Sequence, residues 1–196
     1  MRYSKTHKEE TRRKLLDSSR ALVKKGGFGS TGVDALMSAI GLTAGAFYSH
    51  FPSKQALLRE VVREEMAHSI ALLHPAADAG GQQARKTVRM YLDPAHARHP
   101  EAGCVLPALG AELARVDPQV RATIESGLKH MHAAWREVLG DDDAAWSVMA
   151  QFVGALVLAR TVKSEAARKR ILEANCRHIE RLLDGVARES STPARR

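Results

Sequence analysis

The sequence predicts an all-α protein, with an N-terminal three-helix domain that contains a helix-turn-helix and a C-terminal helical domain, about nine helices in all. Apolar residues recur at helical spacing along the chain, and no stretch shows the sustained alternation of a strand. Glycine, proline and capping residues divide the chain into segments of helix length. Between Gly26 and Leu58, a glycine turn separates two short helical segments, a pattern typical of a helix-turn-helix.

The first expected helix begins near Thr6 and ends at the pair Gly26-Gly27. Thr6 and Glu9 form a capping-box pattern, in which each side chain satisfies a backbone N–H group of the first turn. A stripe of apolar residues marks the face that this helix buries. The stripe consists of Leu15, Leu16, Leu22 and Val23.

The second and third helices are short and are joined by a tight turn. The second helix has one apolar face, formed by Val33, Leu36, Met37 and Ile40. Gly41 stands where the chain must turn, because glycine adopts positive φ at little cost. Thr43 is the expected N-cap of a helix over 44–50, in which Phe47 points inward. Pro52 then ends this helix.

Six further helices are expected downstream. Their ranges are 54–73, 84–93, 104–116, 118–139, 144–162 and 165–186. Proline- and glycine-rich composition predicts loops at 74–83 and 94–103. Asp117 and Pro118 read as an N-cap followed by a proline at the first helical position. The helix over 144–162 is apolar nearly all round, so it needs cover on more than one side.

Positive charge is concentrated at the N-terminal end of the chain. The net charge is +8, and residues 1–54 carry ten Lys and Arg against four acids. A basic helix-turn-helix segment is expected of a domain that neutralises phosphates and releases counterions. Without the motif, the same charges would be read as a solvated basic face.

Several classes of protein are not supported by the sequence. The charged N-terminus lacks the apolar core of a signal peptide, and the longest apolar stretch, 148–159, is too short to span a bilayer. We therefore expect a cytoplasmic protein with no membrane partner. Two cysteines and scattered histidines give no metal pattern, and we find neither a catalytic constellation nor a phosphate loop, so we expect no metal, no cofactor and no enzyme.

The segment from Phe28 to Leu58 carries a family resemblance at fixed offsets. The residues that carry it are Phe28, Thr31, Val33, Leu36, Gly41, Gly45, Phe47-Tyr48, His50-Phe51, Ser53-Lys54 and Leu57-Leu58. This pattern resembles the DNA-binding domain of the tetracycline-repressor (TetR) family of transcriptional regulators and covers about the first 60 residues. The resemblance implies a DNA-binding domain over 1–52, a connecting helix over 53–75, a ligand-binding and dimerisation domain over 76–188 and a flexible tail over 189–196.

The resemblance also implies which residues meet DNA. Those at phosphate-contacting or base-contacting positions are Thr31, Thr43, Ala44, Gly45, Ala46, Tyr48, Ser49, His50 and Lys54. Gly32 departs from the family pattern, because Ser or Thr usually opens that helix. Either Thr31 caps the helix instead, or the phosphate contact there is lost. Ala44 and Ala46 leave methyl contacts for base reading, which discriminate little by themselves.

In the family, the downstream helices enclose a small-molecule effector and the last two pair with a second copy. The resemblance therefore implies a homodimer that binds a palindromic operator, most simply as a repressor, and that an effector releases. Candidate effector contacts are His68, Met90, Tyr91, Cys104, Leu106, Met131, Trp135, Met149 and Phe152. Cys104 opens a helix, where a thiol can be reactive toward electrophiles, although cysteine is commonly a small buried hydrophobe. The alternative is a helical protein-interaction module with a basic face and no specific DNA binding.

Overall fold

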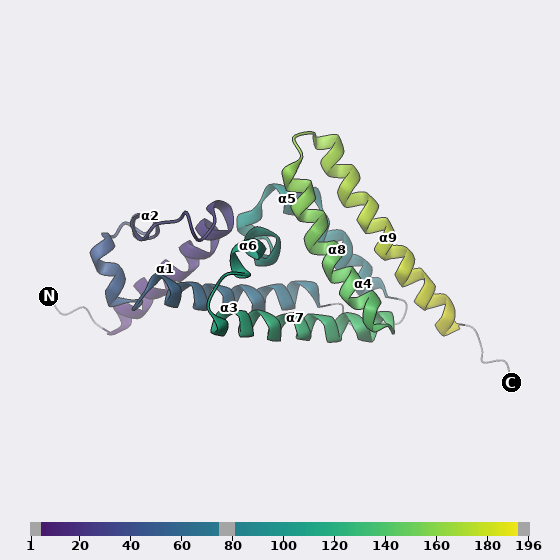
Figure 1. The fold of residues 1–196 in the computed structure, drawn as a ribbon, viewed down its shortest axis with the longest axis horizontal. Helices are drawn as coiled ribbons and strands as arrows, with labels where there is room; N and C mark the ends of the chain where they lie inside the picture. Colours follow the sequence, from purple (N-terminus) through teal and green to yellow (C-terminus); the bar gives the residue numbers. More distant parts are fainter. Residues whose placement is uncertain (1–4, 75–80, 192–196) are drawn as a thin grey trace. The chain divides into compact units, whose positions relative to one another are not determined.

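The computed structural model describes residues 5–74 and 81–191. Within these ranges all regular structure is helical, with nine α-helices and two short 3-10 helices (Figure 1), so the all-α prediction is confirmed. The chain forms two compact units. The N-terminal unit combines Met1–Ala67 with Pro100–Ile124, and the C-terminal unit combines His68–His99 with Glu125–Arg196.

Helix α1 (Lys5–Gly26) is the longest helix of the N-terminal unit. Leu15, Leu16 and Val23 are buried, as the apolar stripe predicted. The helix already includes Lys5, so Thr6 is not its N-cap. Gly27 follows with a φ of 86°, a left-handed conformation that favours glycine and ends the helix.

The next elements of this unit are short. Helix α2 spans Val33–Ser38, and η1, a 3-10 helix, spans Ala44–Ser49. Helix α3 follows over Lys54–Leu73, and Ser53 Oγ accepts a hydrogen bond from the N–H of Ala56 at its start. The unit is completed by η2 (Pro100–Ala102), by α6 (Val105–Leu113) and by the start of α7 (Pro118–Leu139).

Two boundaries in the middle of the chain differ from expectation. Helix α4 spans Gln82–Tyr91, and α5 spans Pro94–Arg98, inside the segment where we expected a loop. Asp93 caps α5 with a 2.7 Å hydrogen bond from the N–H of Ala95, and Pro94 takes the first helical position. This is the same chemistry that opens α7, where Asp117 accepts from the N–H of Gln119 at 3.0 Å. The expected loop at 74–83 lies largely outside the described residues.

The last two helices are long and lie side by side (Figure 1). Helix α8 spans Asp142–Thr161 and α9 spans Glu165–Ser191. Asp141 caps α8 with a 2.6 Å hydrogen bond from the N–H of Ala144. By length and composition alone, α8 could cross a membrane, so the argument from stretch length was too strict. It nevertheless buries seven residues, among them Val148, Phe152 and Leu156, as the core helix of a globular domain does.

The two compact units do not follow the boundaries predicted from the resemblance. The segment Pro100–Ile124, which contains α6, groups with the first 67 residues rather than with the rest of the C-terminal part. The division into a DNA-binding domain, a connecting helix and a regulatory domain stays a prediction. Of the expected tail, 192–196 lies outside the described residues, while α9 continues to Ser191.

Candidate nucleic-acid interface

Helices α2 and η1 form a compact helix-turn-helix. Leu36 and Met37 of α2 and Phe47 of η1 are fully buried, so the two elements pack through their apolar faces. Gly41 lies between them with a φ of 73°, as predicted, and the N–H of Leu42 donates back to the carbonyl of Met37 at 3.0 Å. This is the hydrogen bonding of a helix terminated by a left-handed residue.

The second helix of the motif is exposed and tightly wound. It is a 3-10 helix rather than the expected α-helix, and it ends at Ser49 with His50 as its C-cap. A six-residue segment with a central glycine gains little from α-helical hydrogen bonding, which favours the tighter winding. Thr43 occupies the N-cap position, as predicted, but its side chain makes no capping hydrogen bond. Thr43, Gly45 and Ser49 are exposed, and Ala44 and Ala46 are partly exposed.

Tyr48 is a largely exposed residue of this short helix. Its side chain is 67% exposed, although its ring edge touches the buried ring of Phe47 at a centroid distance of 5.4 Å. The contact with Phe47 therefore holds the Tyr48 ring in place, while most of the side chain remains exposed. A hydroxyl held in this way can donate to a phosphate oxygen without further ordering.

His50 lies against a group of cations from the start of α1. The imidazole is half-buried, and its Nδ1 atom is buried without a hydrogen-bond partner among the described residues. Burial lowers the pKa of His50, and Lys8, Arg12 and His7 lower it further by charge repulsion. Lys8 and His7 are exposed. The end of the helix-turn-helix thus lies close to the cations Lys8 and Arg12 at the beginning of α1.

Lys54 points inward in this structure. Its ammonium group donates to the carbonyl of Phe28 at 2.6 Å and lies 4.4 Å from the centre of the Phe28 ring. The sequence placed Lys54 beside DNA phosphates, whereas here it braces the loop that precedes α2. That loop consists of residues 27–32.

Thr31 does not cap α2. Gly32 is the N-cap residue, and the hydroxyl of Thr31 donates to the carbonyl of Gly27 at 2.6 Å. The Thr31 side chain is also buried. Of the two alternatives left open by the sequence, the structure contradicts capping by Thr31. A phosphate contact from Thr31 stays a prediction.

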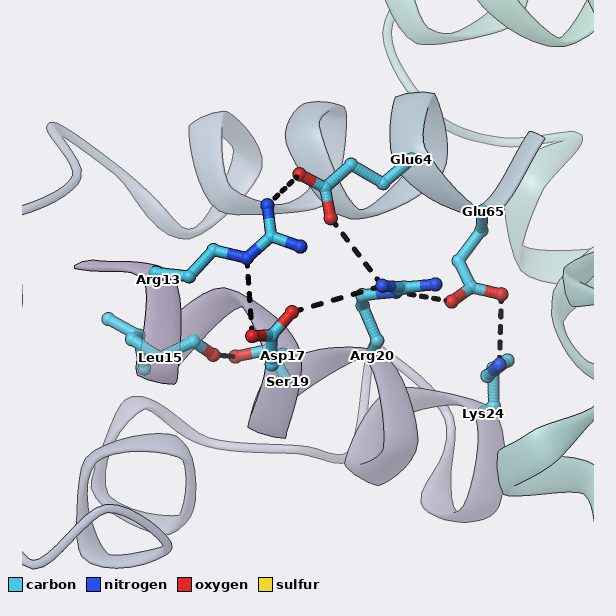
Figure 2. Close-up of polar contacts among 8 residues, drawn as sticks. All are labelled: Arg13, Leu15, Asp17, Ser19, Arg20, Lys24, Glu64 and Glu65. Atoms are coloured by element: carbon cyan, nitrogen blue, oxygen red, sulfur yellow. Dashed lines mark hydrogen bonds and ion pairs between the residues drawn. The ribbon is translucent and has the colours of Figure 1, made fainter. Parts of the chain in front are cut away.

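A network of ion pairs that includes the buried side chains Glu65 and Lys24 joins α1 to α3 (Figure 2). Glu65 has no exposed surface; it accepts from Arg20 at 2.6 Å and from Lys24 at 2.9 Å. Arg13 pairs with both Asp17 and Glu64 at 3.2 Å, and Arg20 lies 3.6 Å from Glu64. Several basic residues of the N-terminal segment are therefore neutralised by α3 and serve packing. Fewer of them face solvent than the charge count suggested.

Glu112 of α6 was missed by sequence reasoning. Its carboxylate accepts hydrogen bonds from the backbone N–H groups of Phe28 at 3.2 Å and Gly29 at 2.6 Å. A Cβ atom on Gly27 would lie only 2.7 Å from Glu112 Oε1, so glycine at this position leaves room for the carboxylate. The available signal was that Glu112 is the single charged residue of α6.

Three of the expected effector contacts come together in the C-terminal unit. The Phe152 ring of α8 lies 4.9 Å from the Tyr91 ring and 5.3 Å from the Trp135 ring, measured between centroids. All three side chains are buried, and Met131 and Met149 are buried as well. The Nε1 atom of Trp135 has no hydrogen-bond partner among the described residues.

The remaining expected effector contacts do not join this aromatic cluster of Tyr91, Trp135 and Phe152. His68 is exposed, and Met90 is 44% exposed. Met90 borders a surface hollow of about 530 Å³, whose other lining residues are Gln82, Arg85, Lys86, Arg89 and Asp93. Cys104 and Leu106 belong to the N-terminal unit, where Cys104 is fully buried at the N-cap of α6.

The described residues contain no group of three or more histidine, cysteine or acidic side chains placed to hold a metal ion. His96 is engaged instead, because its Nδ1 atom lies 2.8 Å from the carbonyl oxygen of Tyr91. His132 stacks on Trp146 with a centroid distance of 4.2 Å.

The fold and the exposed motif define a helix-turn-helix protein whose second helix is accessible. Residues 15–61 match the model of the bacterial regulatory proteins of the tetR family. The N-terminal segment of the chain therefore matches the DNA-binding domain of the TetR family. The family that this model describes is one of regulatory proteins.

Curated relatives match a third of the chain. The HTH-type transcriptional regulators UidR of Escherichia coli (strain K12) and of Shigella flexneri are each 27% identical to the chain over 66 residues. The match spans about a third of the chain and about a third of the length of these relatives (34% of each).

Solved structures resemble nearly the whole fold. The reduced form of Escherichia coli NemR superposes with a TM-score of 0.73 at 20% identity, covering 88% of this chain and 96% of that one. A TetR-family regulator from Agrobacterium tumefaciens gives 0.70 at 22% identity, covering 88% and 98%. A putative regulator from Saccharomonospora viridis, solved with choline, gives 0.68 at 19% identity, covering 88% and 96%. At these identities the likeness shows the fold alone.

Proposed function

We propose that this protein is a cytoplasmic transcriptional regulator that binds a palindromic operator as a homodimer, acts as a repressor and is released by a small-molecule effector. The observation that carries the proposal is the exposed 3-10 helix Ala44–Ser49, set beside the cations of α1 in a TetR-family domain. Small side chains on this helix allow close approach to base edges, and the flanking groups are suited to phosphates.

This arrangement supports the proposed DNA-binding residues. Thr43, Ala44, Gly45, Ala46 and Ser49 are exposed or partly exposed on the helix that would enter the major groove. Tyr48 and His50 flank it, and Lys8 adds an exposed charge. Thr31 and Lys54 would meet phosphates only after leaving the carbonyl groups that they now bind.

Selection of duplexes from a random pool tests this function. We expect a palindromic site with half-sites about one helical turn apart, and binding that weakens as salt rises. Substitution of Lys8 by Ala should reduce the log–log salt slope by about one and weaken binding to all duplexes alike. Lys129→Ala, an exposed lysine of α7, is the control. A protein-interaction module would enrich no sequence.

The dimer is proposed from the outer faces of α8 and α9. Trp146 and Val157 of α8 are exposed by 43% and 41%, and Ala150 lies between them on the same face and is also exposed. Ile171 and Leu182 of α9 are only partly buried. Apolar residues aligned in this way on two neighbouring helices favour a second copy as cover.

The effector site is proposed at the aromatic cluster of Tyr91, Trp135 and Phe152. A buried indole N–H without an acceptor is costly, so a bound molecule that supplies one is favoured. A thermal-shift screen should find neutral or aliphatic compounds that raise the melting temperature of the protein and release the operator. Trp135→Phe should lower the affinity for such a compound without changing operator binding in its absence.

A more specific form of this proposal is that the effector reacts with a cysteine thiol. Cys104 is fully buried, whereas Cys176 is partly exposed but has its pKa raised, mainly by burial. Cys104 would have to become accessible before it could react with an electrophile. Operator release by oxidants or electrophiles should disappear in Cys104→Ser. Unchanged release in that variant would exclude Cys104 as the sensor.

A further inference from the structure

The two ends of α6 are both tied to the end of α1. At the N-terminal end, Lys24 of α1 donates to the carbonyl of Gly103 at 2.9 Å while also pairing with Glu65. At the C-terminal end, Glu112 accepts from the N–H groups of Phe28 and Gly29, in the loop that follows α1. Both attachments involve a charged side chain bound to backbone groups.

Glu112 and Lys54 hold one peptide unit from opposite sides. The peptide that joins Phe28 to Gly29 presents its carbonyl to the Lys54 ammonium and its N–H to the Glu112 carboxylate, each at 2.6 Å. The anion lies at the positive end of the peptide dipole and the cation at the negative end. Charge-assisted hydrogen bonds in this arrangement polarise one another and strengthen together.

This peptide lies at a sensitive point of the motif. Gly29 is four residues before Val33, where α2 begins, and Lys54 is the first residue of α3, five residues after Ser49, where the exposed 3-10 helix ends. The carboxylate of Glu112 therefore connects α6 to both flanks of the helix-turn-helix. Phe28 is buried beneath the same contact and carries the ring that faces Lys54.

We propose that Glu112 is a positioning residue for operator binding. It holds the Phe28–Gly29 peptide, and through it Lys54, so that α6 sets the placement of the exposed 3-10 helix. This inference rests on the proposed DNA-binding function. It assigns a favourable role to a negative charge in a protein whose partner would be a polyanion.

The direction in which operator affinity changes when Glu112 is removed distinguishes a positioning role from a purely electrostatic one. If Glu112 acted only by its charge, its removal would lessen repulsion of DNA and tighten binding. Positioning predicts the opposite, a loss of about tenfold in operator affinity for Glu112→Ala, because the loop loses two charge-assisted hydrogen bonds. Glu137→Gln, an exposed acid of α7, is the charge-matched control and should leave operator affinity unchanged or slightly raised.

The experiment measures affinity of the full chain for the selected operator and for a random duplex. Glu112→Ala should weaken operator binding and leave random-duplex binding unchanged, since the surface cations remain. Glu112→Gln should restore part of the affinity, because its amide oxygen can still accept one N–H group. Hydrogen exchange at the Gly29 amide should accelerate in the Ala variant and to a smaller extent in the Gln variant.

The outcomes distinguish this inference from the function on which it rests. A wild-type protein that selects no duplex overturns the proposed function, and with it the positioning role. Wild-type binding with equal or tighter binding by Glu112→Ala overturns the positioning role alone. Circular dichroism checks the fold. If the Ala variant fails to fold, the Gln variant carries the test, and operator affinity equal to wild type would then refute the inference.

Discussion

The ammonium group of Lys54 donates a 2.6 Å hydrogen bond to the carbonyl of Phe28 and lies 4.4 Å from the centre of that residue's ring. One side chain at the start of α3 thus binds both the backbone and the ring of the loop before α2. The contact fixes the spacing of the two segments that enclose the helix-turn-helix. It also means that Lys54 has a structural role in the absence of DNA.

Lys54→Ala should therefore affect stability as well as DNA binding. We expect a loss of about 1–2 kcal/mol in the free energy of unfolding, from one charge-assisted hydrogen bond and one partly exposed cation–π contact. Urea denaturation measures this loss. An unchanged unfolding free energy in Lys54→Ala would contradict the bracing role.

Tyr48→Phe removes an exposed hydroxyl and should weaken binding to all duplexes without changing stability. Gel-shift titration measures the change in DNA binding.

The charge network of Figure 2 predicts a large penalty when its buried acid is neutralised. Glu65 has no exposed surface and compensates both Arg20 and Lys24. Glu65→Gln takes the charged partner from the buried Lys24 and leaves Arg20 with only its weaker pairs to Asp17 and Glu64, so we expect a loss of about 3 kcal/mol in the free energy of unfolding.

Urea denaturation of a matched variant provides the control. Glu125 pairs with Lys129 on the surface of α7, where both side chains are about two-thirds exposed (66% and 69%). Glu125→Gln should change the free energy of unfolding by about 0.5 kcal/mol or less. Equal effects of the two substitutions would show that the α1–α3 network contributes no more than a surface pair.

The stability of the N-terminal unit should fall as His50 is forced to accept a proton. Burial and the neighbouring cations lower the pKa of His50 below its usual value of about 6.5. The unfolded chain then binds more protons than the folded one between the lowered pKa and about 6.5, so stability rises with pH through this window. It is fully present above about 6.5 and is lost as pH falls.

Melting temperatures at about pH 5 and about pH 7 test this expectation. The wild-type protein should gain more stability over this interval than His50→Gln, which cannot titrate. His7 is a neighbouring titratable group, so His7→Gln serves as the control and should keep most of the wild-type dependence. A pH dependence that is the same in wild type and His50→Gln would exclude His50 as its source.

Local chemistry explains what the sequence could predict. Gly41 and the cap Asp117 were found because a turn or a cap depends on residues within three or four positions. The short α5 was missed although Asp93-Pro94 repeats the pattern of Asp117-Pro118, because the surrounding composition suggested a loop. The Asp93-Pro94 pattern was therefore a usable signal for α5, but the loop-like composition around it was given more weight.

Long-range contacts explain what the sequence could not predict. Glu65 and Lys24 lie 41 residues apart, and Glu112 lies 83 residues from Gly29. No periodicity links such positions, so the basic residues were interpreted as a segment that neutralises DNA phosphates, and the two acids were not singled out. The inward turn of Lys54 has the same origin, because its acceptor belongs to a loop 26 residues earlier. The ends of the helices depend on nearby residues and could be predicted, whereas the ion-pair partners of the charged residues depend on tertiary packing and could not.

The outer face of α8 predicts a substitution that separates the two copies of the proposed dimer. Val157 is 41% exposed on the face that also carries Trp146. A carboxylate there would be buried without a partner in the interface, so Val157→Glu should give a monomer at micromolar protein. Ala166→Glu is the control, because Ala166 is exposed near the start of α9, away from its partly buried apolar face.

Sedimentation velocity measures the oligomeric state, and circular dichroism checks that both variants fold. Because operator half-sites are read by two linked recognition helices, Val157→Glu should also lose most operator affinity while keeping random-duplex binding. Ala166→Glu should retain both properties. A wild-type protein that sediments as a stable monomer would refute the dimer directly. A Val157→Glu dimer would instead show that two copies pair through a different face.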